Sequence, residues 1–274
     1  MSVAVAMGIS GTEVAKEAAD MVLTDDNFAT IEAAVEEGRG VFDNLTKFIV
    51  WTLPTNMGEG LVILAAIFAG TALPILPVQI LWINMTTAVL LGLMLAFEPK
   101  ESDIMQRSPR DPKTPILTGV LIGRIVLVSL IMLVGAFGSF EWALGKGAEW
   151  GLDQAASDSH ARTVAVNVFV MVELFYLFNC RSLTKSMFQL GMFSNLWIWV
   201  GVGSMITLQL LFTYAPFMNR FFHSSPIGWD AWWRILLTAV VAYAIVGLEK
   251  WIRRKWTERA SARVLTIVDS EVKP

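Results

Sequence analysis

The amino-acid sequence predicts an all-α membrane protein, a six-helix transmembrane bundle that follows a short α/β segment at the N-terminus. Three observations predict this class: six long apolar stretches, a composition of 55% hydrophobic and only 16% charged residues, and basic residues grouped in alternate loops. An ordinary soluble domain carries about 25% charged residues. The net charge of -3 gives no basic excess and argues against a nucleic-acid partner. The first expected partner is therefore the lipid bilayer.

The six apolar stretches supply the predicted transmembrane helices. A hydrocarbon core about 30 Å thick takes about 20 helical residues to cross. The predicted spans cover residues 48–70, 73–97, 117–140, 163–180, 196–218 and 232–248. We therefore expect a six-helix membrane domain over residues 46–256 and a cytoplasmic tail over residues 257–274.

Basic residues in alternate connections set the expected orientation. They are Lys100, Arg107, Arg110 and Lys113 after the second span, Arg181 and Lys185 after the fourth, and six more over residues 250–263. The other connections are poorer in Lys and Arg. Because basic loops stay on the cytoplasmic side of a membrane, both termini are expected in the cytoplasm.

Residues 1–45 differ in kind from the rest of the chain. Residues 3–8 and 21–24 indicate two strands, with a helix predicted over residues 12–19 between them. Asp25, Asp26 and Asn27 are expected at the N-cap of a second helix. Parallel α/β sheets are covered on both faces, and about 45 residues cannot build one alone. The segment is therefore expected to be the end of a larger cytoplasmic domain.

The second predicted helix has no Pro or Gly between Phe28 and Gly38, and it continues through residues 41–48 into the first span. A nearly continuous helix that leaves a soluble domain and enters the bilayer acts as a lever. Movement of the cytoplasmic part should therefore be transmitted to side chains within the first span.

Glu59 is the most informative residue, because it lies within the first span. A charged group near the bilayer centre costs roughly 2.5 to 3.5 kcal/mol on insertion scales and normally faces a protein interior or a water path. Asn56 shares its helical face, and Asn84 and Thr87 share one face of the second span. Glu173 lies midway along the fourth. Carboxylate, amide and hydroxyl oxygens are ligands for hard cations, so these side chains predict a cation site.

Structural roles are the alternative for each of these residues. Glu59 and Glu173 could be protonated carboxyls that bond to a neighbouring helix. Asn84 and Thr87 could be polar contacts between helices. Both structural roles would account for a polar group in an apolar segment without a bound cation.

Other polar residues in or near the spans are interpreted as structural. Asn167, Tyr176 and Asn179 are expected to be packing residues rather than ligands. Arg124 and Arg234 lie near span ends, where snorkelling to the interface suffices. The chain has one cysteine, so no intramolecular disulfide is possible.

Several motifs, in order along the chain, resemble those of P-type cation-transporting ATPases. The end of the family's HAD-like phosphorylation domain is similar to VAMG at residues 5–8, GTEVAKEAADMVLTDDNF at residues 11–28 and VEEGR at residues 35–39. The fifth and sixth membrane helices of the calcium-pump branch, and the loop after them, resemble NMGE at residues 56–59, PVQILWIN at residues 77–84 and DIMQRSPR at residues 103–110. The six spans then correspond to the family's last six membrane helices.

The resemblance implies ATP-driven transport of a cation, with a divalent ion such as Ca²⁺ as the first expectation. The matching ion-ligand positions are Asn56, Glu59, Asn84, Thr87 and Glu173. The family's phosphorylated aspartate, nucleotide domain and first four membrane helices do not occur among these 274 residues. We therefore expect no catalytic or cofactor-binding residue here and no ATP hydrolysis by this chain alone. ATP and Mg²⁺ would act only in a full-length pump, whose N-terminal part is an expected partner.

Ala88 is the main departure from the resemblance. The calcium pumps carry an aspartate at the matching position, directly after the threonine that corresponds to Thr87. Fewer carboxylates offset less of the cost of dehydrating a divalent ion. One divalent ion, a monovalent ion or a proton therefore remain alternatives to two calcium ions.

Two other functions remain open. A six-helix secondary transporter or channel would explain Glu59 but not the α/β start of the chain. A non-catalytic fragment of a pump is the other alternative. Similarity to prokaryotic members favours a multi-pass protein of the bacterial inner membrane.

Overall fold

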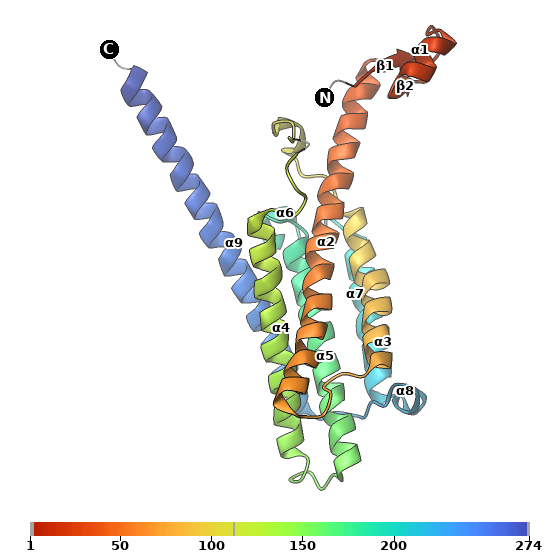
Figure 1. Cartoon of the computed structure of the whole chain (residues 1–274), viewed down its shortest axis with the longest axis vertical. Helices are drawn as coiled ribbons and strands as arrows, with labels where there is room; N and C mark the ends of the chain where they lie inside the picture. Colours follow the sequence, from red (N-terminus) through yellow and green to blue (C-terminus); the bar gives the residue numbers. More distant parts are fainter. Residues whose placement is uncertain (1–2, 112, 273–274) are drawn as a thin grey trace.

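The computed structural model describes residues 3–111 and 113–272, with side chains of the last helix described through Trp256 and at Arg259. Parts of two predicted segments, residues 1–2 and 273–274, lie outside the described residues. The described chain is mostly helical, and two long helices, α2 and α9, continue beyond the same end of the bundle (Figure 1). The elements in chain order are β1 (Val5–Met7), α1 (Glu13–Ala18), β2 (Met21–Leu23), α2 (Ala29–Ala69), α3 (Pro77–Thr87), η1 (Ala88–Gly92), η2 (Leu93–Phe97), η3 (Ile104–Gln106), α4 (Gly119–Lys146), α5 (Gln154–Cys180), α6 (Met187–Leu190), α7 (Leu196–Tyr214), α8 (Pro216–Phe222) and α9 (Trp229–Val272).

Within the described residues, six helices are long and apolar enough to cross a membrane, which confirms the predicted membrane class. They cover Ala29–Ala69, Pro77–Phe97, Gly119–Lys146, Gln154–Cys180, Leu196–Tyr214 and Trp229–Trp256. The predicted end of the fifth span at residue 218 is wrong. Pro216 cannot donate a backbone hydrogen bond, so α7 ends at Tyr214 and the separate helix α8 begins at the proline.

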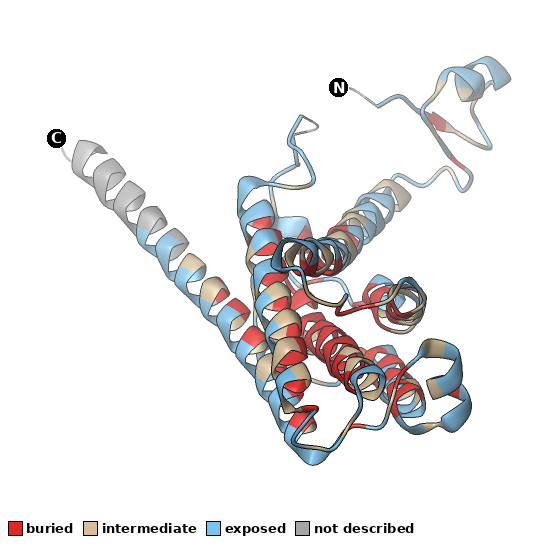
Figure 2. Ribbon diagram, turned by 60° about the horizontal axis from the view of Figure 1, so that its bottom comes forward, coloured by how far each residue is buried: buried red, intermediate tan, exposed pale blue. Residues whose placement is uncertain are grey.

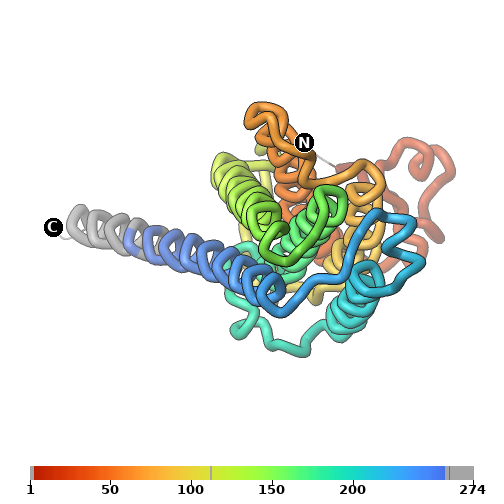
Figure 3. The backbone as a smooth tube through the Cα atoms, turned by 90° about the horizontal axis from the view of Figure 1, so that it is seen from below, coloured from red at the N-terminus to blue at the C-terminus, as the bar shows by residue number. Residues whose placement is uncertain are grey.

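The α5 helix lies at the centre of the bundle. Its apolar window is 89% buried, whereas the same measure is 28–39% for the other five spans. Seen along the bundle, α5 lies among α2, α4, α7 and α9 (Figure 3), and burial along it is almost continuous (Figure 2). A helix surrounded by other helices is the expected location for polar groups kept away from lipid.

The N-terminal segment forms the predicted strand, helix and strand. β1 and β2 pair in parallel, with Val5 opposite Met21, and the Thr12 hydroxyl accepts a hydrogen bond from the Ala15 amide at the start of α1. This two-stranded sheet does not by itself establish a HAD-like fold.

Asp26 has a different role from the predicted N-cap. Asp26 adopts a left-handed backbone conformation, with φ at 52°. Its two carboxylate oxygens accept hydrogen bonds of 2.8 Å from the backbone amides of Ile9 and Ser10. These hydrogen bonds, the one from Ile9 above all, lower the pKa of the Asp26 carboxyl. The stabilisation that they give the turn is therefore lost only as the pH falls through that lowered pKa. Asn27, not Asp26, accepts the Ala29 amide at the helix start.

The predicted continuous helix is confirmed. α2 runs for 41 residues from the N-terminal segment to the far end of the first span, with Pro54 inside it. A proline removes the hydrogen bond to the carbonyl four residues earlier, which is the carbonyl of Val50. The Tyr176 hydroxyl of α5 donates to that carbonyl at 3.1 Å, so the break is compensated by a neighbouring helix.

Candidate functional site

Glu59 is held inside the bundle by α2. Its side chain is only 4% exposed, and its Oε2 accepts a hydrogen bond of 2.9 Å from the Asn84 amide on α3. Its Oε1 is buried and has no hydrogen-bond partner. Glu59 and Asn84, which lie in two separate spans, are therefore in direct contact.

Glu173 extends the same polar cluster from the central helix α5. It is completely buried, and its carboxylate interacts electrostatically with Glu59 and lies beside the hydroxyls of Thr55 and Thr87. Thr87 donates to the Ile83 carbonyl at 2.9 Å, and neither carboxylate oxygen of Glu173 has a partner with hydrogen-bond geometry. Two carboxylates from two helices thus interact electrostatically, and three of their oxygen atoms are unpartnered.

Hydrogen bonds between helices fix the backbone around this cluster. Trp51 donates from its indole to the Glu173 carbonyl at 3.1 Å, and Ser129 of α4 donates to the Pro54 carbonyl at 3.1 Å. The backbone near Pro54 is therefore held by neighbouring helices.

The helix carrying Asn84 and Thr87 changes geometry directly after them. α3 ends at Thr87, and the chain continues as one turn of π-helix, η1, and then as the 3₁₀-helix η2. Single π-helical turns inside longer helices occur frequently at functional sites. Gly92 lets this segment pack closely against α2. A Cβ added at Gly92 would lie 2.6 Å from the Phe48 ring and 2.8 Å from the Trp51 ring.

Asn56 is the one predicted ligand that this chain does not bring into the cluster. It lies on an exposed side of α2, and its amide donates to the Thr52 carbonyl at 3.3 Å. Thr52 and Thr55 were not predicted, although their hydroxyl oxygens are also buried and unpartnered. Their spacing of two turns and one turn before Glu59 was the available signal.

The cluster contains two acidic side chains and otherwise neutral oxygens. Among the described residues, no group of three or more His, Cys, Asp or Glu could hold a metal ion. The chemistry of the donors is therefore that of carboxylates supplemented by amide and hydroxyl oxygens, which suits a hard cation.

The three residues predicted to be structural do pack between helices. Asn167 bonds to the Thr213 hydroxyl at 3.1 Å, Tyr176 to α2, and Asn179 to the Tyr243 carbonyl at 3.2 Å. The snorkelling interpretation of Arg124 is wrong. Its guanidinium is buried and pairs with Glu249 of α9 at 2.7 Å, a partner that lies 125 residues away and was invisible in the local sequence.

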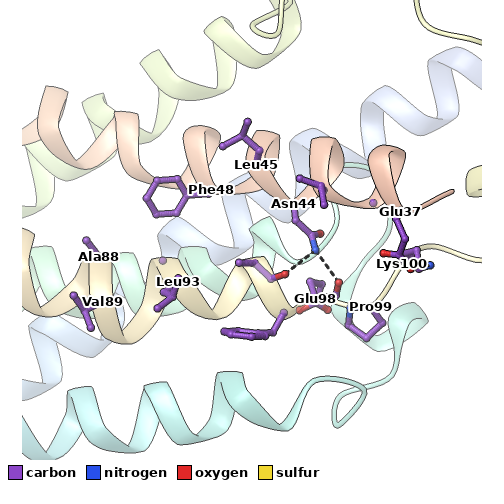
Figure 4. A pocket seen from close by; sticks show the side chains of 15 residues that line it. Glu37, Asn44, Leu45, Phe48, Ala88, Val89, Leu93, Glu98, Pro99 and Lys100 are labelled. Carbon is purple, nitrogen blue, oxygen red and sulfur yellow. Dashed lines mark hydrogen bonds and ion pairs between the residues drawn. The ribbon is translucent and has the colours of Figure 1, made fainter. Parts of the chain in front are cut away.

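An open groove lies between α2 and the segment after Thr87. It has a volume of about 680 Å³ and is mostly apolar, with Phe48, Ala88 and Leu93 facing into it (Figure 4). Ala88, where an aspartate was expected, therefore opens onto this groove, directly after Thr87 of the cluster. At the other end of the groove, the Asn44 amide donates to the carbonyls of Ala96 at 3.2 Å and Glu98 at 2.9 Å.

The loop after η2 is also attached to the N-terminal part of α2. The Arg39 guanidinium donates to the carbonyls of Ile104 and Arg107 at 2.8 Å each, and Arg107 pairs with Asp43 at 2.6 Å. Lys185 bonds to Asp103 at 3.1 Å and lowers the pKa of that carboxyl. A shift of α2 along its axis would therefore pull on both the loop and the end of the second span.

Comparison with known proteins matches residues 72–252 to the family described as "Cation transporting ATPase, C-terminus". "Probable cation-transporting ATPase F" of Mycobacterium tuberculosis is 60% identical over 253 residues, which are 92% of this chain and 27% of that protein. "Cation-transporting ATPase pma1" of Synechocystis sp. is 41% identical over 87% of the chain and 26% of its own length. "Calcium-transporting ATPase" of Bacillus subtilis is 36% identical over 89% of the chain and 27% of its own length.

The chain thus spans about a quarter of the length of these curated relatives. Its similarity to them covers nearly all of the chain. The resemblance seen in the motifs is confirmed, and this chain belongs to the P-type cation-transporting ATPase family, whose C-terminal transmembrane region it carries.

Proposed function

We propose that this chain forms the cation-binding part of an ATP-driven pump. Glu59, Asn84, Thr87 and Glu173 act as ligands for the transported ion. The observation that carries the proposal is the pair of buried carboxylates, Glu59 and Glu173, with three oxygens that receive no hydrogen bond. Two desolvated negative groups on adjacent helices repel each other unless a cation or a proton lies between them. Asn56 stays a predicted ligand on its spacing alone.

The transported ion is proposed to be a hard cation, and most specifically a divalent one. The relatives from Bacillus subtilis and Bacillus cereus are named calcium-transporting ATPases, and the donor set consists of oxygen atoms alone. Two carboxylates balance the charge of one divalent ion. The absence of a carboxylate at Ala88 is the reason for proposing one such ion rather than two at this cluster.

The other functions are less well supported. A six-helix secondary transporter or channel gives no reason for the 41-residue helix α2 or for its bonds to the loop of residues 98–118. A lever of this kind is useful when movement of a soluble domain must reach the bilayer. We propose that residues 1–45 are the end of a HAD-like phosphorylation domain, and that ATP and Mg²⁺ act elsewhere in the complete pump.

We also propose that both termini and the loop of residues 98–118 lie in the cytoplasm of a bacterium, across its inner membrane. A single thiol introduced as Ser108→Cys should react with an impermeant maleimide only when the cytoplasmic side is accessible. Ser108 is exposed, and the native Cys180 is buried. The matched control is Ala148→Cys at the opposite end of the bundle, which should react only from outside. Labelling of the Ser108→Cys variant from outside would contradict the orientation.

A direct test of the site is Ala88→Asp in a complete pump that contains this chain. The new carboxylate would lie one turn after Asn84, facing the open groove beside Thr87. We expect at least roughly a tenfold gain in affinity for Ca²⁺ or a second bound ion, measured by equilibrium binding of radioactive calcium. Ala88→Asn supplies the same shape without the charge and should produce neither change. Equal effects of Asp and Asn would contradict a role for charge at this cluster.

A further inference from the structure

A second polar cavity, separate from the carboxylate cluster, lies at the end of the bundle from which α9 continues. It has a volume of about 190 Å³ and is enclosed by the end of α5, the loop that carries α6, and α9. In Figure 1 the α6 loop lies at this same end of the bundle. The position is the boundary at which α9 leaves its apolar segment.

The cavity is positively charged. Lys250 and Arg254 line it together with the polar side chains of Ser186 and Gln189, and none of its lining residues in the described chain is acidic. The nearest carboxylate on α9, Glu249, instead pairs with Arg124 on another side of the helix. The described lining therefore carries a net positive charge.

The Lys250 ammonium has a donor left for a further hydrogen-bond acceptor. Its side chain is buried, and its ammonium donates to the carbonyls of Asn179 and Ser182. An ammonium group has three donors and no acceptor, so one remains after these two bonds. Arg254 bonds to Gln189 at 3.4 Å, which places a planar guanidinium on the rim. Lysine, arginine and serine side chains that line one cavity suit the oxygens of a phosphate group.

The cavity also opens toward the lipid-facing part of α9. Gly247 lies one turn before Trp251, and a Cβ added to it would meet no atom within 4 Å. Trp251 is half exposed, and the Lys255 ammonium lies 4.1 Å from the centre of its ring. Tryptophan and lysine at a helix end are typical of the headgroup layer of a bilayer. A ligand in the cavity can therefore extend into the apolar layer along α9.

We propose that this cavity binds the phosphate headgroup of an anionic phospholipid, with Lys250 and Arg254 as its cationic partners. Basic pockets between helices on the cytoplasmic side bind lipid headgroups in this way. We propose that the phosphate belongs to a lipid rather than to free phosphate. The open space beside Gly247 and the half-exposed Trp251 extend the site toward the bilayer. This binding does not depend on the cation cluster or on transport.

The test is native mass spectrometry of the purified full chain in detergent with added dioleoyl phosphatidylglycerol, dioleoyl phosphatidylcholine or inorganic phosphate. We expect one phosphatidylglycerol to be retained in preference to phosphatidylcholine. Arg254→Gln should lower its apparent affinity about fivefold, since one basic residue near an anionic surface contributes about 1 kcal/mol. Gly247→Leu, which fills the gap without changing charge, should lower it as well.

Matched controls separate the site from general attraction to charge. Arg259→Gln removes the same charge from an exposed position on α9 that does not line the cavity, and Gly203→Leu adds the same volume to α7, where an added Cβ also meets nothing. Both should leave binding within about twofold of the unaltered chain. Equal losses in Arg254→Gln and Arg259→Gln would overturn the proposal. So would binding of inorganic phosphate that depends on Arg254 while no phospholipid is retained.

Discussion

Replacing Glu59 with Gln is expected to abolish cation-dependent phosphorylation by ATP in a complete pump that contains this chain. Glutamine keeps the size of the side chain and an oxygen that can accept the Asn84 hydrogen bond, which is 2.9 Å long. The negative charge is lost, and with it half of the counter-charge supplied by Glu59 and Glu173. Removing one partner from a buried ion pair costs about 3 to 5 kcal/mol. Cation affinity should therefore fall at least about a hundredfold, because about 1.36 kcal/mol is a factor of ten.

The measurement is the amount of phosphoenzyme formed from labelled ATP as a function of cation concentration. Glu141→Gln is a matched control, because Glu141 is another carboxylate in a membrane helix with a buried, unpartnered oxygen, but it lies on α4 outside the cluster. The control should keep its cation dependence. Thermal stability in detergent verifies that Glu59→Gln still folds. An unchanged cation dependence in a folded Glu59→Gln protein would assign Glu59 a purely structural role.

The cluster could be predicted from the sequence only where charge made it conspicuous. Glu59 and Glu173 are acidic residues within apolar helices, and such residues have few reasons to be there other than function. The hydroxyl oxygens of Thr52 and Thr55 are also buried and unpartnered, but a threonine in a membrane helix is so often a simple contact between helices that its sequence carries little information. Thr55 lies beside Glu173 because of the rotation of α2, which only the packed bundle sets.

The unwinding after Thr87 could not be predicted either, because it depends on neighbours far away in the sequence. A side chain on Gly201 of α7 would clash with the Leu90 carbonyl inside η1, so α7 approaches the irregular backbone directly. Gly92 meets Phe48 and Trp51 of α2 in the same way. The local sequence of residues 88–97 is simply apolar and predicts a regular helix. The six spans, by contrast, were predictable, since length and hydropathy are local properties.

The second large effect is expected at Arg181, which connects the end of the second span to the start of α7. Its guanidinium is completely buried and pairs with Glu98 at 2.8 Å. It also donates to the Met192 carbonyl at 3.1 Å and to the Ser194 hydroxyl at 2.6 Å. Asn195 donates to the other oxygen of Glu98 at 3.0 Å. Arg181→Met leaves the Glu98 carboxylate buried with a neutral partner only.

Breaking such a pair costs about 3 to 5 kcal/mol, which for a chain of this size corresponds to a fall in Tm of roughly 10 °C. Thermal unfolding in detergent, followed by circular dichroism, measures it. Lys146→Met is the matched control, because Lys146 pairs with Glu149 at an exposed site, where such pairs contribute little. A fall in Tm of the same size in both variants would contradict a special role for the buried pair.

The double variant Arg181→Met with Glu98→Met distinguishes a penalty of burial from a gain by pairing. With both charges removed, no carboxylate is left without a partner, and much of the lost stability should return. The Glu98 carbonyl, which accepts the Asn44 amide, is unaffected by either substitution. If the double variant regains its Tm but a complete pump that carries it binds the cation more weakly than the unaltered pump, the pair acts by fixing the end of η2 relative to α2. Through η2 it would then set the position of Thr87 beside Glu173.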